Sequence, residues 1–229
     1  MATEESFKTV LKYISQIWFG GVGSIALAVL VVLPYPPAAF SVEPDIGSIT
    51  GVRGSVVLKR PGSADPLTVK ERVAFKVGDV IETDAKASAQ MTLTDDSFVN
   101  LGPASSVRVS QYAFDPATDR RTAIVRVIEG KSRFVIYRLR SQESSFRVET
   151  DTARLMIGGV ADFVVLASQG RTNVAVLDHG LIVRNSIPYV VGDVRIGVNQ
   201  MAIVQEKSPP TAPVVITQQE RKAWLKDLK

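Results

Sequence analysis

Cysteine is absent from the 229 residues, and histidine occurs once, as His179. The missing thiols exclude a disulfide scaffold, a cysteine nucleophile, an iron–sulfur cluster and any cysteine-ligated zinc site. A single imidazole also excludes a metal centre built from several histidines. Apolar residues make up 45% of the chain, which is enough for a core and excludes wholesale disorder. This length predicts one domain with appendages, or two small domains.

Charged residues are missing from Tyr13 to Val42, and the densest apolar part of that stretch is 17–33. As a helix this part spans about 25 Å, the short limit for a bilayer core. Prolines follow it, and Ala39-Phe40-Ser41 places small residues at −3 and −1 of a cleavage site. We therefore expect 1–41 to be a cleaved signal peptide or an N-terminal membrane anchor. An uncleaved anchor would contact the membrane through 17–33.

The charges on either side of this stretch predict its orientation. Lys8 and Lys12 precede it, whereas Glu43 and Asp45 follow it. This asymmetry keeps the N-terminus inside and exports the rest of the chain. We expect the exported part to lie in the periplasm or on the periplasmic face of the inner membrane.

Between Ser48 and Val204 the apolar residues alternate with a period of two. In residues 88–94, for example, Ala89, Met91 and Leu93 share one face, a pattern typical of half-buried antiparallel strands. The run 163–166 is apolar on both faces, which predicts a strand between two layers. We predict an all-β domain over residues 42–207, either an antiparallel sandwich or a solenoid-like fold.

Turn residues separate many of these runs. Glu129-Gly130, Gln169-Gly170 and His179-Gly180 each lie between two strand-like stretches, and Asp95-Asp96 has the composition of a hairpin tip. Glycine adopts the positive φ that tight hairpins need. We therefore expect Gly130 and Gly180 to occupy hairpin turns with positive φ.

The composition changes after the β domain, so residues 208–229 are predicted to form a separate segment. Residues 208–213 are proline-rich and predict an extended linker. Thr217 and Glu220 have the spacing of a capping box, which predicts a short helix over 218–229. A helix this short needs a surface to dock on. That surface is either its own β domain or a partner, and the apolar residues that would reach it are Trp224, Leu225 and Leu228.

Positive charge is concentrated in residues 120–147, where eight basic side chains face only two acidic ones. The segment could be a solvated strand face, or a patch for an envelope protein, an anionic envelope polymer or a lipid surface. Nucleic acid is not expected, because the domain is exported and the segment has no nucleic-acid-binding motif. The basic residues of this candidate patch are Arg120, Arg121, Arg126, Lys131, Arg133, Arg138, Arg140 and Arg147.

No group of residues in the sequence forms a convincing catalytic constellation. His179 precedes a glycine at a predicted turn and has no evident triad partner. The acidic pairs Asp95–Asp96 and Asp115–Asp119 also lie in predicted turns, where aspartate binds backbone amides. No calcium-loop spacing or phosphate-binding loop is present. We predict no catalytic, cofactor or metal site, and therefore not an enzyme.

Several short motifs occur in an order that resembles the FecR-type domain of bacterial envelope proteins. The resemblance covers residues 47–205 and rests on 77–83, 95–101, Tyr112, 129–130, 146–150, 163–165 and 176–183. It implies an all-β, non-enzymatic domain outside the inner membrane. The Arg-Gly-Thr that usually precedes the Phe-x-Val strand is missing here. About 16 residues precede the apolar run, too few to fold and hold a sigma factor, so this chain alone is not expected to control one directly.

Three functions remain open from the sequence. The first is a non-catalytic binding or scaffold domain of the cell envelope. The alternative is a membrane-anchored sensory protein that relays a signal, which an uncleaved N-terminal segment would permit. The third and weakest is a hydrolase of envelope polymers that uses the paired aspartates.

Overall fold

The computed structural model describes residues 43–70, 72–137 and 141–228. The predicted signal or membrane segment, 17–33 with the cut after Ser41, lies outside these residues. Within the described ranges, no helix is long and apolar enough to cross a membrane. These ranges contain seventeen strands and the short helix α2 (Gln218–Leu225). The prediction of a mostly β domain that ends in a short helix is therefore confirmed.

The strands form two sheets, A and B, that share one strand. In sheet A the hydrogen-bonded neighbours are, in order, β4 (Val73–Phe75), β1 (Gly47–Arg53), β6 (Ser88–Leu93), β7 (Phe98–Leu101), the second half of β9 (Arg120–Ile136), β12 (Ala161–Ser168), β13 (Arg171–Asp178), β16 (Gln200–Gln205) and β17 (Val214–Val215). In sheet B they are β3 (Leu67–Thr68), β2 (Val56–Lys59), β5 (Val80–Thr83), β8 (Ser106–Asp115), the first half of β9, β10 (Ser145–Glu149), β11 (Ala153–Ile157), β14 (Leu181–Asn185) and β15 (Asp193–Ile196).

Inward-facing side chains of the two sheets make one continuous core. Its centre is aromatic: the rings of Phe134 and Phe163, both in sheet A, stack at 5.1 Å. Phe146 of sheet B meets Phe134 edge-on at 6.4 Å. The alternation read from the sequence is confirmed, because Ala89, Met91 and Leu93 of β6 are all buried. The sheets therefore pack as the two layers of a sandwich.

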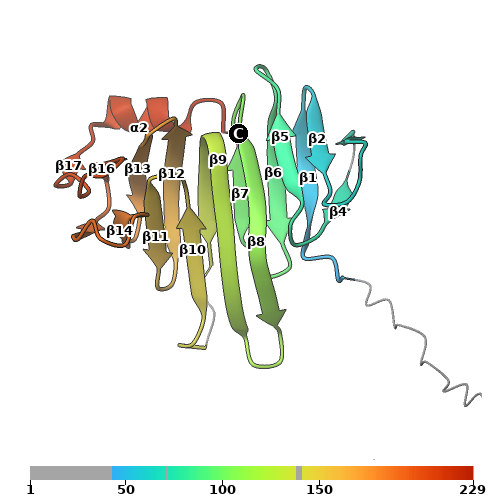
Figure 1. Ribbon diagram of the computed structural model, residues 1–229, viewed down its shortest axis with the longest axis horizontal. Coiled ribbons are helices and arrows are strands. Elements are labelled where there is room, and N and C mark those ends of the chain that lie inside the picture. The colour runs from blue at the N-terminus through green and yellow to red at the C-terminus, as the bar shows by residue number, and fades with distance from the viewer. Residues whose placement is uncertain (1–42, 71, 138–140, 229) are drawn as a thin grey trace, which may run out of the picture. The chain divides into compact units, whose positions relative to one another are not determined.

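Strand β9 passes from one sheet to the other and lies near the middle of Figure 1, between β8 and β10. Its residues 120–129 pair with β8 and, over 122–126, with β10 in sheet B. Its residues 130–136 pair with β12 and, over 132–135, with β7 in sheet A. Because β9 ends in sheet A, the chain must return to sheet B before β10 begins. This return makes the β9–β10 pair parallel, a departure from the purely antiparallel arrangement that we predicted.

Gly130 lies at the point where β9 changes sheets. Its φ of +86° confirms the predicted positive value, but the predicted hairpin at this position is wrong. The alternating pattern is interrupted at Glu129-Gly130 because the strand bends there. A Cβ on Gly130 would lie 2.4 Å from Ser105 Oγ and 2.5 Å from the Ala104 carbonyl oxygen. Only glycine fits this backbone conformation and this close contact.

The other predicted turns divide into two kinds. Hairpins are confirmed at Gln169-Gly170, between β12 and β13, and at Asp95-Asp96, between β6 and β7. A hairpin at His179-Gly180 is wrong, because the chain there leaves β13 in sheet A and enters β14 in sheet B. The positive φ belongs to His179, at 58°, and not to Gly180. A turn residue followed by glycine between two strand-like stretches therefore occurs both at hairpins and where the chain crosses from one sheet to the other.

The proline-rich segment stays attached to sheet A. The Thr211 amide donates to the Ile203 carbonyl at 2.9 Å, Pro210 is buried, and β17 pairs with β16. The segment that we expected to be an extended linker therefore runs along the edge of the sheet.

Helix α2 begins with the predicted capping box, since Thr217 Oγ1 accepts from the Glu220 amide and the Glu220 carboxylate accepts from the Thr217 amide. Hydrogen bonds from the Thr217 amide and hydroxyl hold the pKa of Glu220 below its usual value. The helix ends at Leu225, earlier than predicted.

The C-terminal segment packs on the outer face of sheet A. Leu228 is buried in a small cluster with Val164 of β12 and Leu177 of β13, and Trp224 and Leu225 pack against that cluster. This second layer explains why the run 163–166 is apolar on both faces. Lys131 Nζ donates to the Lys226 carbonyl at 2.6 Å, where it interacts with the negative end of the helix dipole. Burial lowers the pKa of Lys131 from its ordinary value.

We predict that Gly130→Ala lowers the free energy of unfolding by about 3 kcal/mol or more, because backbone strain and a steric overlap add. Gly170 is the matched control, since its φ is +67° but nothing lies within 4 Å of its added Cβ. Gly170→Ala should therefore cost about 1 kcal/mol, the strain alone. Denaturant unfolding of both variants measures the difference. Equal losses would contradict the crossing geometry of β9.

We predict that truncation after Ile216 lowers the free energy of unfolding by about 2–4 kcal/mol, because it uncovers Val164 and Leu177. Val215→Ala is the control: Val215 is 75% exposed, and its substitution should change stability by less than about 0.5 kcal/mol. Thermal or denaturant unfolding provides the comparison. A truncated protein as stable as the full chain would mean that the helix does not cover sheet A.

Candidate functional site

The outer face of sheet B carries arginines in cross-strand register. Its first row joins positions that face one another on neighbouring strands, from β8 to β15. Arg108 is paired with Arg126, Arg154 with Arg184, and Glu149 lies between the two pairs. The complete row is Arg108, Arg126, Glu149, Arg154, Arg184 and Asp193.

A second row on the same face mixes arginine with apolar side chains. Arg147 of β10 lies between Ile124 of β9 and Met156 of β11. Ile182 of β14 then pairs with Arg195 of β15. Ile124, Met156 and Ile182 are half-buried, whereas Arg147 and Arg195 are exposed. We call the two rows together the arginine face; its basic residues are Arg108, Arg126, Arg147, Arg154, Arg184 and Arg195.

Acidic side chains on the arginine face neutralise only part of its charge. Arg126 Nη2 lies 2.5 Å from Asp151 Oδ1, and Arg184 Nη2 lies 2.6 Å from Asp193 Oδ2. Glu149 forms ion pairs with two arginines: its Oε1 lies 3.7 Å from Arg147 Nη1 and 3.8 Å from Arg154 Nε. In the described part of the chain, Arg108 and Arg195 have no ion pair. The face therefore keeps an excess of positive charge.

The basic patch predicted from the sequence does not form one surface. Of its eight residues, Arg126 and Arg147 lie on the arginine face. Arg120 pairs with Glu143 beside the β8–β9 turn at 3.1 Å, and Arg133 binds Asp162 with two hydrogen bonds of 2.9 and 2.7 Å on sheet A. Lys131 contacts the C-terminal segment, Arg121 is buried, and Arg138 and Arg140 lie outside the described residues.

Sequence reasoning missed Arg108, Arg154, Arg184 and Arg195. Each occupies an outward position of an alternating strand, and that signal is visible in the sequence. Their assembly into one face is not visible, because it depends on which strands are neighbours. Counting charges over the continuous segment 120–147 therefore found arginines that are close in sequence and missed those that are close only in space.

Arg121, near the start of β9, takes part in a buried polar cluster. Its guanidinium, with a side chain 2% exposed, pairs with the fully buried Asp95 and also donates to Ser97 Oγ at 3.1 Å. The Phe146 ring lies beneath it at 5.0 Å. Tyr112 accepts from the Asp95 amide at 3.1 Å, and burial, with the nearby Asp95 carboxylate, raises the pKa of Tyr112. The cluster joins the β6–β7 hairpin to β9 and faces the core.

Three of the four aspartates considered for catalysis have structural roles. Asp95 belongs to the buried pair, and Asp96 adopts the positive φ of the hairpin tip. Asp115 accepts from the Thr118 hydroxyl at 2.6 Å and the Ala117 amide at 2.9 Å, and these bonds lower its pKa. His179 lies 3.3 Å from its neighbour Asp178 at the corner between the sheets. No acidic or histidine group that could hold a metal ion occurs among residues 43–70, 72–137 and 141–228.

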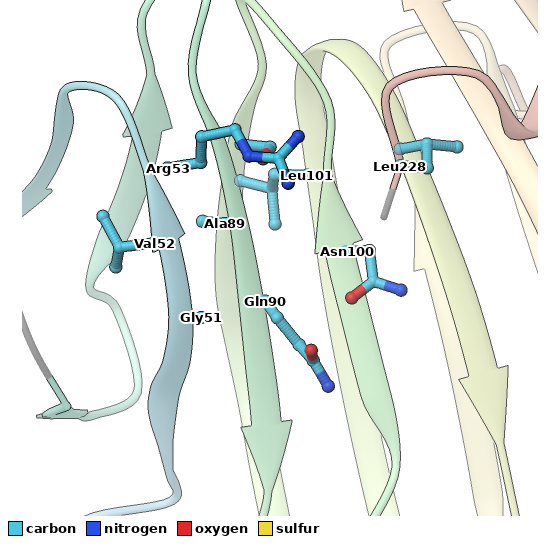
Figure 2. A pocket seen from close by; sticks show the side chains of 9 residues that line it. Gly51, Val52, Arg53, Ala89, Gln90, Asn100, Leu101 and Leu228 are labelled. Atoms are coloured by element: carbon cyan, nitrogen blue, oxygen red, sulfur yellow. The ribbon is translucent and has the colours of Figure 1, made fainter.

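A small pocket lies on sheet A beside the C-terminal segment. Figure 2 shows its lining, with Gln90 of β6 and Asn100 of β7 on adjacent strands and Leu228 at one end. Its volume is about 170 Å³, below the range of about 300–1,000 Å³ typical of small-molecule sites. The arginine face, which spans six strands, is more extensive than this pocket.

We predict that Asp95→Asn lowers the free energy of unfolding by about 3 kcal/mol, because it leaves the Arg121 charge buried without its partner. Asp96→Asn is the adjacent control. Asp96 is exposed and asparagine tolerates its positive φ, so the change should stay below about 0.5 kcal/mol. Equilibrium unfolding of the two variants tests this. A loss of similar size in both would contradict the buried pair.

Comparisons with known proteins agree with this architecture. Residues 79–180 match the family described as FecR protein. Two crystal structures of a candidate anti-sigma factor from Parabacteroides distasonis ATCC 8503, at 2.50 and 1.65 Å, each align with a TM-score of 0.50 and 25% sequence identity. In each case the alignment covers 64% of this chain and 64% of the other, slightly less than two thirds. A search among curated proteins found no match. Residues 79–180 therefore match the FecR family, as the sequence resemblance predicted.

Proposed function

We propose that this chain is a signal-relay protein of the bacterial cell envelope. In this proposal the FecR-type domain lies on the periplasmic face of the inner membrane, and residues 17–33 cross the membrane uncleaved. The observation that carries the proposal is the FecR match over residues 79–180, together with the fold shared with a candidate anti-sigma factor. It favours the second of the three functions considered from the sequence, and the role needs no catalytic step.

The way the chain enters the domain supports a relay. Ile46 is 4% exposed, its amide donates to the Phe75 carbonyl at 3.0 Å, and its carbonyl accepts from the Thr94 amide at 3.1 Å. Strand β1 begins at the next residue. A displacement of the chain at Ile46 would therefore act directly on sheet A.

Strand β9 supplies the second part of the proposed relay. The arginine face belongs to sheet B, whereas β1 belongs to sheet A. Both halves of β9 are held by strands on each side, so a force on one sheet reaches the other through continuous backbone. In the proposed relay, a partner that binds the arginine face therefore changes the force on the N-terminal segment. Packed side chains, hydrogen-bond networks and rigid secondary elements are the structures that carry coupling of this kind.

The competing function is a released scaffold domain, and the small residues Ala39 and Ser41 are the observation that favours it. The two differ in whether the N-terminal segment remains attached. A chain without cysteine allows a clean test, because an introduced cysteine is the only thiol. Ser63 is an exposed turn residue, and Ser6 lies ahead of the apolar stretch.

We predict that Ser63→Cys reacts with a membrane-impermeant maleimide in intact cells, whereas Ser6→Cys reacts only after lysis. Both proteins should keep the intact mass of the full chain. Labelling of Ser6→Cys in intact cells, or cleavage after Ser41, would contradict the anchored relay.

The relay itself is tested by replacing residues 1–41 with a cleavable signal peptide in cells that lack the native chain. The readout is the set of transcripts whose levels change when the native chain is deleted. We expect the released domain to reach normal levels without restoring these transcripts. Full restoration by the released domain would support the scaffold function in place of the relay.

A further inference from the structure

We propose that the arginine face is a docking surface for an acidic surface of a partner protein. The inference goes beyond the proposed function, because docking does not require that a signal be passed on. It rests on four properties of the outer face of sheet B: its charge, the availability of its guanidinium groups, its size and its side-chain chemistry.

The charge of the face is positive even after its own acids are counted. Six arginines are opposed by Glu149 and Asp193 in the first row and by Asp151 at the β10–β11 turn. Six minus three leaves a formal charge of +3. A patch of this sign attracts acidic partners and accelerates their association.

The guanidinium groups are available to a partner. In the Arg126–Asp151 pair the side chains are 40% and 67% exposed, and in the Arg184–Asp193 pair 45% and 50%. Ion pairs this exposed contribute little to stability, so an incoming carboxylate can replace the internal one. Arg108 and Arg195, at opposite ends of the face, are exposed, and neither has an ion-pair partner among the described residues.

Measured across the strands, the face is nearly as long as a protein–protein contact. Its six strands, from β8 to β15, lie side by side through five consecutive pairings. At about 4.8 Å per pairing, the rows extend about 24 Å. A standard interface buries about 800 Å² on each partner, a patch about 28 Å across. In this direction the arginine face therefore has nearly the width of such a patch.

The side chains favour a protein over a membrane as the occupant. Ile124, Met156 and Ile182 are half-buried between arginine stems, a combination enriched in protein interfaces. Their partial burial leaves little apolar surface to insert into a bilayer, and no aromatic side chain occupies either row. All six basic residues are arginine, whose planar fork binds carboxylates with two hydrogen bonds. Simple attraction to anionic lipids does not require arginine.

The test places a photo-crosslinking amino acid at Met156 in the full chain and irradiates intact cells. We expect one discrete adduct with a protein. The double variant R108E/R195E should reduce its yield at least tenfold, because the face changes sign. The control K70E/K86E makes the same charge change at two exposed lysines off the face, and its yield should stay within twofold.

Two competing reagents, added to membranes isolated from these cells, distinguish an acidic protein surface from a lipid surface as the partner. Poly-L-glutamate should suppress the adduct, and phosphatidylglycerol vesicles should not. An adduct with lipid, an adduct equally strong in R108E/R195E, or no adduct would each overturn the proposal. If R108E/R195E does not fold, Arg108→Gln with Arg195→Gln serves in its place. A protein adduct that is lost in R108E/R195E and suppressed by poly-L-glutamate would support the docking surface. If cells with this adduct show no change in transcripts when the native chain is deleted, the relay is refuted and the docking surface is not.

Discussion

The passage of β9 between the two sheets is the constraint on which the rest of the structure depends. Its first half is an interior strand of sheet B and its second half an interior strand of sheet A. Gly130 permits the bend, and Ser105 Oγ secures it by accepting from the Lys131 amide at 3.0 Å. The parallel β9–β10 pair follows from the bend, because the chain has to return to sheet B. Lys131, one residue later, also contacts the C-terminal segment.

Local patterns predicted the strands better than they predicted the connections. Alternation identified β6, because one buried face imposes a period of two whatever the neighbouring strands are. The double-sided run in β12 correctly indicated a second layer. Glu129-Gly130 was misread as a hairpin, since a sheet crossing and a hairpin both need glycine at positive φ. His179-Gly180 shows the same ambiguity, resolved only by the pairing of β13 with β16 and of β14 with β11.

The candidate site was harder to predict than the fold, because it exists only in the register between strands. Arg108 and Arg195 are far apart in sequence and are joined by five strand pairings. A sequence window instead grouped Arg121 with its neighbours, although its pairing with Asp95 removes it to the core. The C-terminal helix was the easier case, since its capping box and apolar residues are local. Even there, the surface that it covers became visible only when Val164 and Leu177 were placed on sheet A.

The central claim is that β9 couples the two sheets into one cooperative unit, and native-state hydrogen exchange tests it most directly. The amides of residues 122–128 and 131–136 lie on opposite sides of Gly130. The account predicts that both groups exchange through the same global opening, with equal free energies and equal dependence on denaturant. If residues 122–128 exchange through a separate opening of lower free energy while 131–136 remain protected, the sheets unfold independently and the coupling is contradicted.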